Sequence, residues 1–307
     1  MVSPNSVKHL KVNHLCERKT HKSAVVVNSY IVFSRFHAGM PAGCKVIHTI
    51  KASGVEVCGL SVCQSELHVL LCDTKEGQGQ IKTYDIHNYK NKQARLSTPV
   101  SVMWDMASSV TDNCLYMSNL HTNKLQKVTR TGSLTDFRVA GSQIRGLAML
   151  PNGNLLVTCR NPDALTEVGG DGAIVNKILL PRSVMQPWHA VWLSTGNFAV
   201  CHGSGPNSEH RVCIVESSGH VTRSFGSYYG SESSELNVPC HLAVDENDFI
   251  FVADCINKRV TLLCPMLTFV CHVTDKMKSR PQRLYLDRDA QRLYVGQQWG
   301  HVLVVQL

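Results

Sequence analysis

Apolar and polar positions follow a repeating order along this chain. A short apolar run, a polar turn and a second apolar run are followed by another turn and by a run in which apolar and polar residues alternate. The clearest copy lies at residues 239–263, where Pro-Cys-His-Leu-Ala-Val-Asp precedes Phe-Ile-Phe-Val-Ala-Asp and Asn-Lys-Arg-Val-Thr-Leu-Leu. Each run has the length and composition of a β-strand. One copy therefore predicts three antiparallel strands that follow one another along the chain.

This order recurs six times, and the repetition predicts the fold. Copies begin near residues 57, 103, 144, 187, 239 and 281. Repeats of about 40–50 residues that hold several strands each are typical of propeller blades. We therefore predict an all-β, six-bladed β-propeller over residues 24–307. The apolar runs 24–27 and 30–33 leave a seventh blade as an alternative.

The two ends of the propeller are predicted to meet in one blade. The last copy stops at Leu307, on its third strand, which would leave a sheet edge unpaired. Residues 44–50 have strand character and lie just before the first copy, so we expect them to supply the missing outer strand and close the ring. Residues 1–23 are basic and carry little strand signal, and we expect them to form a flexible arm.

Composition narrows the cellular setting. The chain has 307 residues, of which 43% are hydrophobic, and a formal net charge of +8. No apolar run approaches the roughly 18 residues of a membrane helix, and the first residues lack the apolar core of a signal peptide. We therefore expect a cytoplasmic protein without a membrane partner. The thirteen cysteines form no Cys-x-x-Cys pair and mostly lie in apolar runs, which predicts buried free thiols.

Residues 239–260 resemble the NHL repeat. The pattern of that family is Pro-x-x-Leu-Ala-Val-Asp, then an apolar strand that ends in Val-Ala-Asp, then Asn-x-Arg-Val. The resemblance is strong over residues 186–307, moderate over 103–159 and weak before residue 57. The chain is similar to the C-terminal propeller of tripartite-motif (TRIM-NHL) proteins, without their RING and B-box part.

The resemblance implies a recognition function. Propellers of this family bind protein or single-stranded RNA, and in a ubiquitin-ligase system they recognise the substrate while a RING finger supplies the ligase activity. The zinc-ligand spacings of a RING finger are missing from this sequence. We therefore expect a non-catalytic scaffold without a cofactor. A protein partner is favoured, single-stranded RNA is the alternative, and neither DNA nor a membrane is expected.

Candidate binding residues come from the repeat register and from the loops. The third residues of the six copies are Gly59, Asp105, Gly146, His189, His241 and Arg283, which share one position in the blades. Basic and aromatic residues nearby would suit an RNA strand, although charged loops are more often simply solvated. The predicted binding residues, on the channel and loop face, are His189, His241, Arg283, Arg145, Lys124, Arg259 and Trp299.

A zinc-dependent enzyme is the alternative function. Histidine and carboxylate side chains at strand ends can hold zinc, and the amidating lyase is similar in placing zinc-binding histidines on such first strands. The ligands would come from His189, His202, His241 and Asp254. The competing interpretation is that these side chains hydrogen bond to turns and to neighbouring blades.

Overall fold

The structure is a computed structural model that describes most of the chain beyond the first 43 residues. The basic arm predicted at 1–23 and the apolar runs 24–27 and 30–33 lie outside the described residues. All regular elements of the described part are strands. No helix in that part is long and apolar enough to cross a membrane. The described residues are 44–52, 55–73, 75–92, 100–101, 103–119, 121–138, 143–205 and 207–307.

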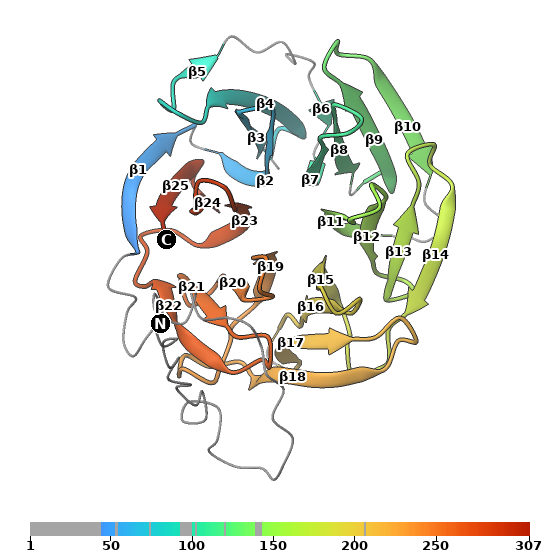
Figure 1. Ribbon diagram of the computed structural model, residues 1–307, viewed down its shortest axis with the longest axis vertical. Helices are drawn as coiled ribbons and strands as arrows, with labels where there is room; N and C mark the ends of the chain where they lie inside the picture. The colour runs from blue at the N-terminus through green and yellow to red at the C-terminus, as the bar shows by residue number, and fades with distance from the viewer. Residues whose placement is uncertain are drawn as a thin grey trace, which may run out of the picture.

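The strands form six sheets arranged around a central channel, as Figure 1 shows. Within each sheet the strands are antiparallel, and the first strand of each sequence repeat lies innermost, beside the channel. The prediction of an all-β, six-bladed propeller is therefore confirmed. We number the blades 1 to 6 from the first sequence repeat onward.

The first three blades are continuous in sequence. Blade 1 contains β2 (Glu56–Cys63), β3 (Glu66–Asp73), β4 (Gln78–Asp85), β5 (Asn91–Lys92) and β6 (Val100–Ser101). Blade 2 contains β7 (Met103–Ser109), β8 (Cys114–Asn119), β9 (Lys124–Thr129) and β10 (Leu134–Arg138). Blade 3 contains β11 (Ile144–Met149), β12 (Leu155–Cys159), β13 (Ala164–Val168) and β14 (Ile174–Leu179).

The remaining blades follow the same plan, except that the last one draws on both parts of the chain. Blade 4 contains β15 (Pro187–Trp192), β16 (Phe198–His202), β17 (Glu209–Val215) and β18 (Val221–Tyr228). Blade 5 contains β19 (Pro239–Val244), β20 (Ile250–Asp254), β21 (Arg259–Leu263) and β22 (Phe269–Thr274). Blade 6 contains β23 (Pro281–Asp287), β24 (Arg292–Gln297), β25 (His301–Gln306) and β1 (Lys45–Lys51).

Strand β1 closes the ring as the sequence predicts. It pairs antiparallel with β25, and Ile50 lies opposite Val302 in the register. Ile50 is buried with Val302 and Val304 in one apolar cluster. The hydrogen bonds of β1 therefore cover the sheet edge that β25 would otherwise expose.

The hydrophobic core lies between the blades. Successive residues of a strand point to opposite faces of its sheet, so each blade contributes side chains to both neighbours. In β20, Phe251 packs in the cluster that contains Leu293 of blade 6, whereas Val252 packs in the cluster that contains Ala199 of blade 4. All twelve cysteines of the described part are free thiols, and only Cys44 among them is not fully buried.

Each innermost strand carries a β-bulge near its start. Pro239 pairs with Asp254 and His241 pairs with Ala253, so that Cys240 between them has no partner residue on β20. In blade 3 the bulge spans two residues, since Ile144 and Leu147 pair with Cys159 and Val157. A bulge redirects a side chain that regular pairing would hold in the sheet. The bulged residues of the other four blades are Cys58, Trp104, Trp188 and Gln282.

Candidate functional site

The third residues of the six repeats meet in the channel, and we call them the inner ring. Four of them carry polar side chains that are almost fully buried: Asp105, His189, His241 and Arg283. The other two are glycines that leave space for their neighbours. A Cβ atom on Gly146 would lie 2.8 Å from the Cα of His189, so a side chain there would displace that strand.

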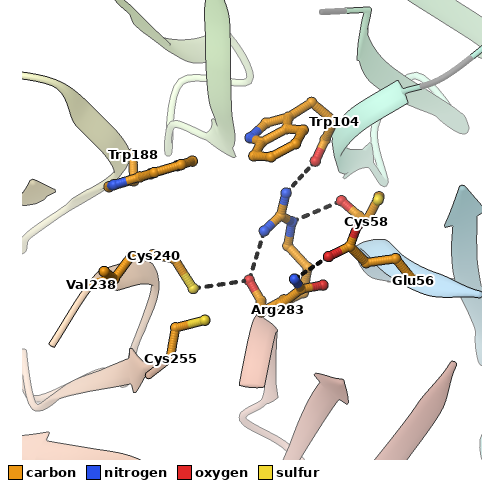
Figure 2. A pocket seen from close by; sticks show the side chains of 9 residues that line it. Glu56, Cys58, Trp104, Trp188, Val238, Cys240, Cys255 and Arg283 are labelled. Atoms are coloured by element: carbon orange, nitrogen blue, oxygen red, sulfur yellow. Dashed lines mark hydrogen bonds between the residues drawn. The ribbon is translucent and has the colours of Figure 1, made fainter. Parts of the chain in front are cut away.

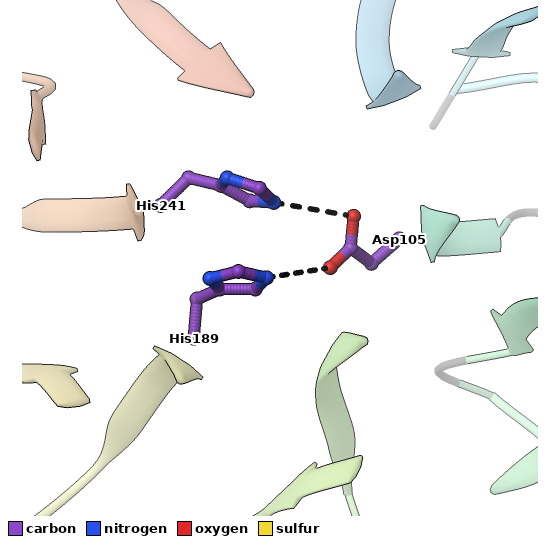
Figure 3. Close-up of side chains that lie close together, drawn as sticks. All are labelled: Asp105, His189 and His241. Carbon is purple, nitrogen blue, oxygen red and sulfur yellow. Dashed lines mark ion pairs between the residues drawn. The ribbon is translucent and has the colours of Figure 1, made fainter. Parts of the chain in front are cut away.

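Asp105 is the centre of the inner ring. Its Oδ2 accepts a hydrogen bond from the backbone N–H of Leu147 at 2.8 Å, and its Oδ1 lies 3.3 Å from Nε of Arg283. Figure 3 shows the two imidazoles reaching it from the opposite side, with Nε2 of His241 at 3.6 Å and Nε2 of His189 at 3.8 Å. Burial alone would raise the pKa of Asp105, but His241 and Arg283 outweigh it and hold the pKa at about 2. The group is therefore a carboxylate.

Backbone contacts fix the tautomers of the two histidines. Nδ1 of His189 accepts the N–H of Leu242 at 3.3 Å, so its proton is on Nε2, which donates to the carbonyl of Leu147 at 3.1 Å. Nδ1 of His241 accepts the N–H of Leu284 at 3.3 Å, which directs its Nε2–H at Asp105. The rings stack at 3.7 Å. Burial lowers the pKa of His189 to about 3 and lowers that of His241 as well, so both are neutral.

Asp105, His189 and His241 are close enough to suggest a metal site, since one ligand atom of each lies within 4.8 Å of the others. The hydrogen bonds do not fit such a site. A metal on Nε2 would place the imidazole proton on Nδ1. In His189 this proton would point at the N–H of Leu242, and in His241 at the N–H of Leu284, so that two donors would face each other. The guanidinium of Arg283 also competes for the same carboxylate.

The other two ligands expected for zinc have different partners. Nε2 of His202 lies 3.4 Å from Sγ of Cys213 inside blade 4. Asp254 accepts hydrogen bonds from Nε of Arg259 at 2.7 Å and from the N–H of Asn237 at 2.7 Å. The structure therefore joins His189 and His241 to Asp105 and does not gather the predicted set of four.

Arg283 links blade 6 to blades 1 and 2. It donates from Nε to the carbonyl of Cys58 at 2.7 Å and from a terminal nitrogen to the carbonyl of Trp104. A third hydrogen bond of 2.7 Å goes to the carbonyl of Gln282. Figure 2 shows this guanidinium beside the pocket at the end of the channel.

The second residues of the repeats surround the end of the channel, and we call them the mouth ring. The bulges place them there, one position before the inner ring. A pocket of about 90 Å³ is lined by five of them together with the other residues that Figure 2 draws, and Arg145 does not line it. The mouth ring consists of Cys58, Trp104, Arg145, Trp188, Cys240 and Gln282.

Arginine and tryptophan side chains form one wall of this mouth. The indoles of Trp104 and Trp188 stack at 5.9 Å, and the guanidinium carbon of Arg145 lies 5.1 and 5.5 Å from their centres. That of Arg160, which follows β12, lies 4.3 Å from the centre of Trp188. Burial and the nearby Arg283 lower the pKa of Arg145, and burial and Arg145 lower that of Arg160 to about 10. The wall therefore concentrates positive charge.

One nitrogen of the Arg145 guanidinium lacks a partner. Its Nε is buried without a hydrogen-bond partner in the described part of the chain, whereas the side chain as a whole is partly exposed. The ion pairs found among the described residues do not include it. A buried polar atom without a hydrogen bond is costly.

The remaining predicted binding residues lie elsewhere. Lys124 begins β9 and pairs with Asp136 on β10 at 2.8 Å, away from the channel. Trp299 is 59% exposed in the turn between β24 and β25. Arg259 was expected on a binding surface, and this is wrong, because its side chain is buried. It pairs with Asp254 and donates to the carbonyls of Ser231 and Glu235, which anchors the loop before β19.

The sequence predicts the inner ring but little of the mouth ring. Of the mouth ring it predicts Arg145 as a binding residue, and neither Trp104 nor Trp188 nor the neighbouring Arg160. The signal was present in the repeat register, because residues one position before the inner ring must share a place in every blade. What the register does not reveal is the bulge that turns them toward the channel.

Comparison with known proteins supports the fold. No family model matches the sequence, and no curated protein matches it. The virginiamycin B lyase from Staphylococcus aureus is similar in structure, with a TM-score of 0.60 and 14% identity over 86% of this chain and 99% of that one. Its catalytically inactive variant with quinupristin has a TM-score of 0.60 and 12% identity, over 85% of this chain and 98% of that one. A protein of unknown function from Bacteroides caccae has a TM-score of 0.57 and 16% identity, over 74% of this chain and 81% of that one.

These matches correct one expectation. The sequence was interpreted as a non-catalytic module, but propellers that match over nearly their whole length include a lyase. Absence of catalysis therefore does not follow from this fold. The solved structures do not confirm the specific resemblance to TRIM-NHL propellers. What they establish, at these identities, is that the chain has the fold of a six-bladed β-propeller.

Proposed function

We propose that this propeller recognises an anionic group of a partner molecule at the mouth of its channel. The observation that carries the proposal is the position of Arg145. Its guanidinium packs against two indoles and has neither a carboxylate nor, at Nε, a hydrogen-bond partner in the described chain. Arginine binds phosphate and carboxylate groups through paired hydrogen bonds, and these are stronger than hydrogen bonds between neutral groups.

The pocket at the mouth has room for an anionic group. Its volume of about 90 Å³ accommodates a phosphate or a carboxylate group. Trp104 and Trp188 are partly exposed beside it and offer flat surfaces to the rest of the ligand. An acidic protein segment and a single-stranded RNA both present such groups, so both belong to the proposed class of partner.

Binding assays with both partner classes test this proposal. Fluorescence polarisation at low salt would be measured with a single-stranded oligoribonucleotide and with an acidic peptide, each against a neutral peptide of equal length. We expect saturable binding of at least one anionic probe that weakens as salt is added, because screening reduces charge interactions. Absence of binding by both anionic probes, or equal binding of the neutral peptide, would contradict the proposal.

Catalysis in the channel is a second candidate function. The observation in its favour is the whole-length similarity to virginiamycin B lyase together with the carboxylate and two imidazoles that converge across the channel. As the structure stands, neither His189 nor His241 has an imidazole nitrogen free to take a proton from a substrate. The N–H of Leu242 or of Leu284 must first release Nδ1.

A product assay separates this candidate from binding alone. The protein would be incubated with quinupristin, the ligand named with the lyase variant, and the mixture analysed by mass spectrometry. A product that chromatography separates from quinupristin, and that Asp105→Asn abolishes, would support a lyase. Unchanged quinupristin after prolonged incubation with folded protein would exclude this substrate for the channel.

A further inference from the structure

Two cysteines form a close pair in the wall of the mouth pocket. Cys240 is the bulged residue of β19, and Cys255 directly follows β20 in the same blade. Both line the pocket and each is 8% exposed. Figure 2 shows the two sulfur atoms side by side at the pocket wall. The anion-binding role of the mouth does not use either thiol.

Backbone contacts hold the pair in place. The thiols of Cys240 and Cys255 are close enough to influence each other's ionisation. The Sγ of Cys240 lies 3.5 Å from the carbonyl of Pro281 and 3.6 Å from that of Gln282. The N–H of Cys255 donates to the carbonyl of Val238 at 3.3 Å, so its backbone is fixed opposite the bulge. The two sulfurs therefore stay adjacent without a covalent bond.

The surroundings favour ionisation of one member. The neighbouring thiol of Cys240 lowers the pKa of Cys255, burial opposes this, and the positive charges of Arg280 and Arg283 lower it further. The neighbouring thiol of Cys255 in turn raises the pKa of Cys240. Since the thiolate is the reactive form of cysteine, Cys255 is suited to attack an oxidant and Cys240 is suited to react with the product of that attack.

We propose that Cys255 and Cys240 are a peroxide-reactive thiol pair that closes to a disulfide in the wall of the mouth pocket. The thiolate of Cys255 attacks one oxygen of hydrogen peroxide, the O–O bond breaks, and a sulfenic acid forms with release of one water after protonation. The sulfur of Cys240 then attacks the sulfenic sulfur, and its thiol proton leaves with the hydroxyl as a second water. Two thiols and one peroxide become one disulfide and two waters.

A second cysteine pair, in blade 1, can be compared with the pair in blade 5. Cys58 and Cys72 occupy the matching bulge and strand-end positions, and their thiols also influence each other's ionisation. They are only 3% and 1% exposed, and Sγ of Cys72 donates to the carbonyl of Met103 at 3.0 Å. Cys72 does not line the pocket. We therefore expect peroxide to reach the blade 5 pair first.

Peptide mapping tests the proposal without any ligand. The native protein would be treated with limiting hydrogen peroxide, unfolded in N-ethylmaleimide and digested with trypsin. Residues 224–258 form one tryptic peptide whose only cysteines are Cys240 and Cys255. We expect this peptide to become two hydrogens lighter and to lose both alkylation sites before any other cysteine peptide changes.

Variants assign the two roles. Cys255→Ser should leave Cys240 alkylatable after peroxide treatment, whereas Cys72→Ser should leave the oxidation rate of the 224–258 peptide within about twofold of the unchanged protein, because the two pairs are independent. The proposal is overturned if that peptide remains fully alkylated in the unchanged protein, or if the blade 1 peptide oxidises first. Because the readout is a peptide mass, failure here leaves the anion-binding proposal untouched.

Discussion

At the scale of single residues, the inner ring is held by charge and by backbone hydrogen bonds together. Asp105 receives the N–H of Leu147 from the next blade, and His189 and His241 receive those of Leu242 and Leu284 in the same way. Each polar side chain therefore fastens its own blade to another one. This explains how buried polar groups are tolerated in the channel, since each has a partner.

Acid should destabilise the protein through His189. Its pKa is about 3 in the folded protein against 6.5 for an unperturbed imidazole, so between these values only the unfolded chain takes up the proton. Unfolding is then favoured as the pH falls from 6.5 towards 3, by about 1.4 kcal/mol per pH unit for one such group. Urea titrations across this range measure the slope.

A neutral replacement isolates that contribution. His189→Gln should reduce the pH slope by about one proton, and His220→Gln, on an exposed turn, should leave it unchanged. If the variant at 189 keeps the full slope, the buried neutral state of His189 is contradicted. Comparison of slopes rather than of absolute stability keeps the test valid even when the variant is less stable.

At the scale of the elements, close packing of the innermost strands depends on glycine. A Cβ atom at Gly146 would lie 2.7 Å from the carbonyl oxygen of Trp188 and 2.8 Å from the Cα of His189, both of which belong to β15. Gly146→Ala should therefore destabilise the protein by about 1–3 kcal/mol, the usual cost of overpacking. The free energy of unfolding in urea measures this effect.

Gly170 provides the matched control for that substitution. A Cβ atom there would first meet the flexible carboxylate of Asp112, at 3.3 Å. Gly170→Ala should change the free energy of unfolding by less than about 0.5 kcal/mol, as surface substitutions usually do. Equal losses at the two positions would contradict the tight approach of β11 to β15.

The closing strand is also testable. Deletion of residues 1–51 removes β1 and exposes the edge of β25, which should lower the melting temperature and promote association through the free edge. Deletion of residues 1–43 leaves β1 in place and serves as the control. Light scattering and thermal unfolding would follow both proteins. If the two deletions behave alike, β1 does not have the closing role that its pairing implies.

The sequence predicts the strands and the closure of the ring, but not every buried contact between distant segments. The alternation of apolar runs and turns predicts the blades, and the unpaired last strand predicts the closure by residues 44–50, because both follow from strand periodicity and edge pairing. The burial of Arg259 was not predictable, since its carbonyl partners belong to a loop about 25 residues earlier in the chain. The pocket was missed because a bulge leaves no mark in the hydrophobic pattern.

At the scale of the whole molecule, the ring brings together groups that are far apart in the chain. Arg145 and Arg160 come from blade 3, Trp104 from blade 2 and Arg283 from blade 6, and they meet at one end of the channel. A site built this way depends on closure of the propeller. The proposed recognition at the mouth therefore depends on the stability of the fold, and binding assays need variants whose folding has been verified.

The most direct measurement compares the dissociation constant of the best anionic probe for Arg145→Gln and for Lys124→Gln. Lys124 carries the same charge but pairs with Asp136 on the outer strands. We expect Arg145→Gln to weaken binding about tenfold or more, the effect of losing a charged hydrogen bond. Lys124→Gln should stay within about twofold, as expected for an exposed ion pair. Equal affinities for the two folded variants would contradict an anion site at the channel mouth.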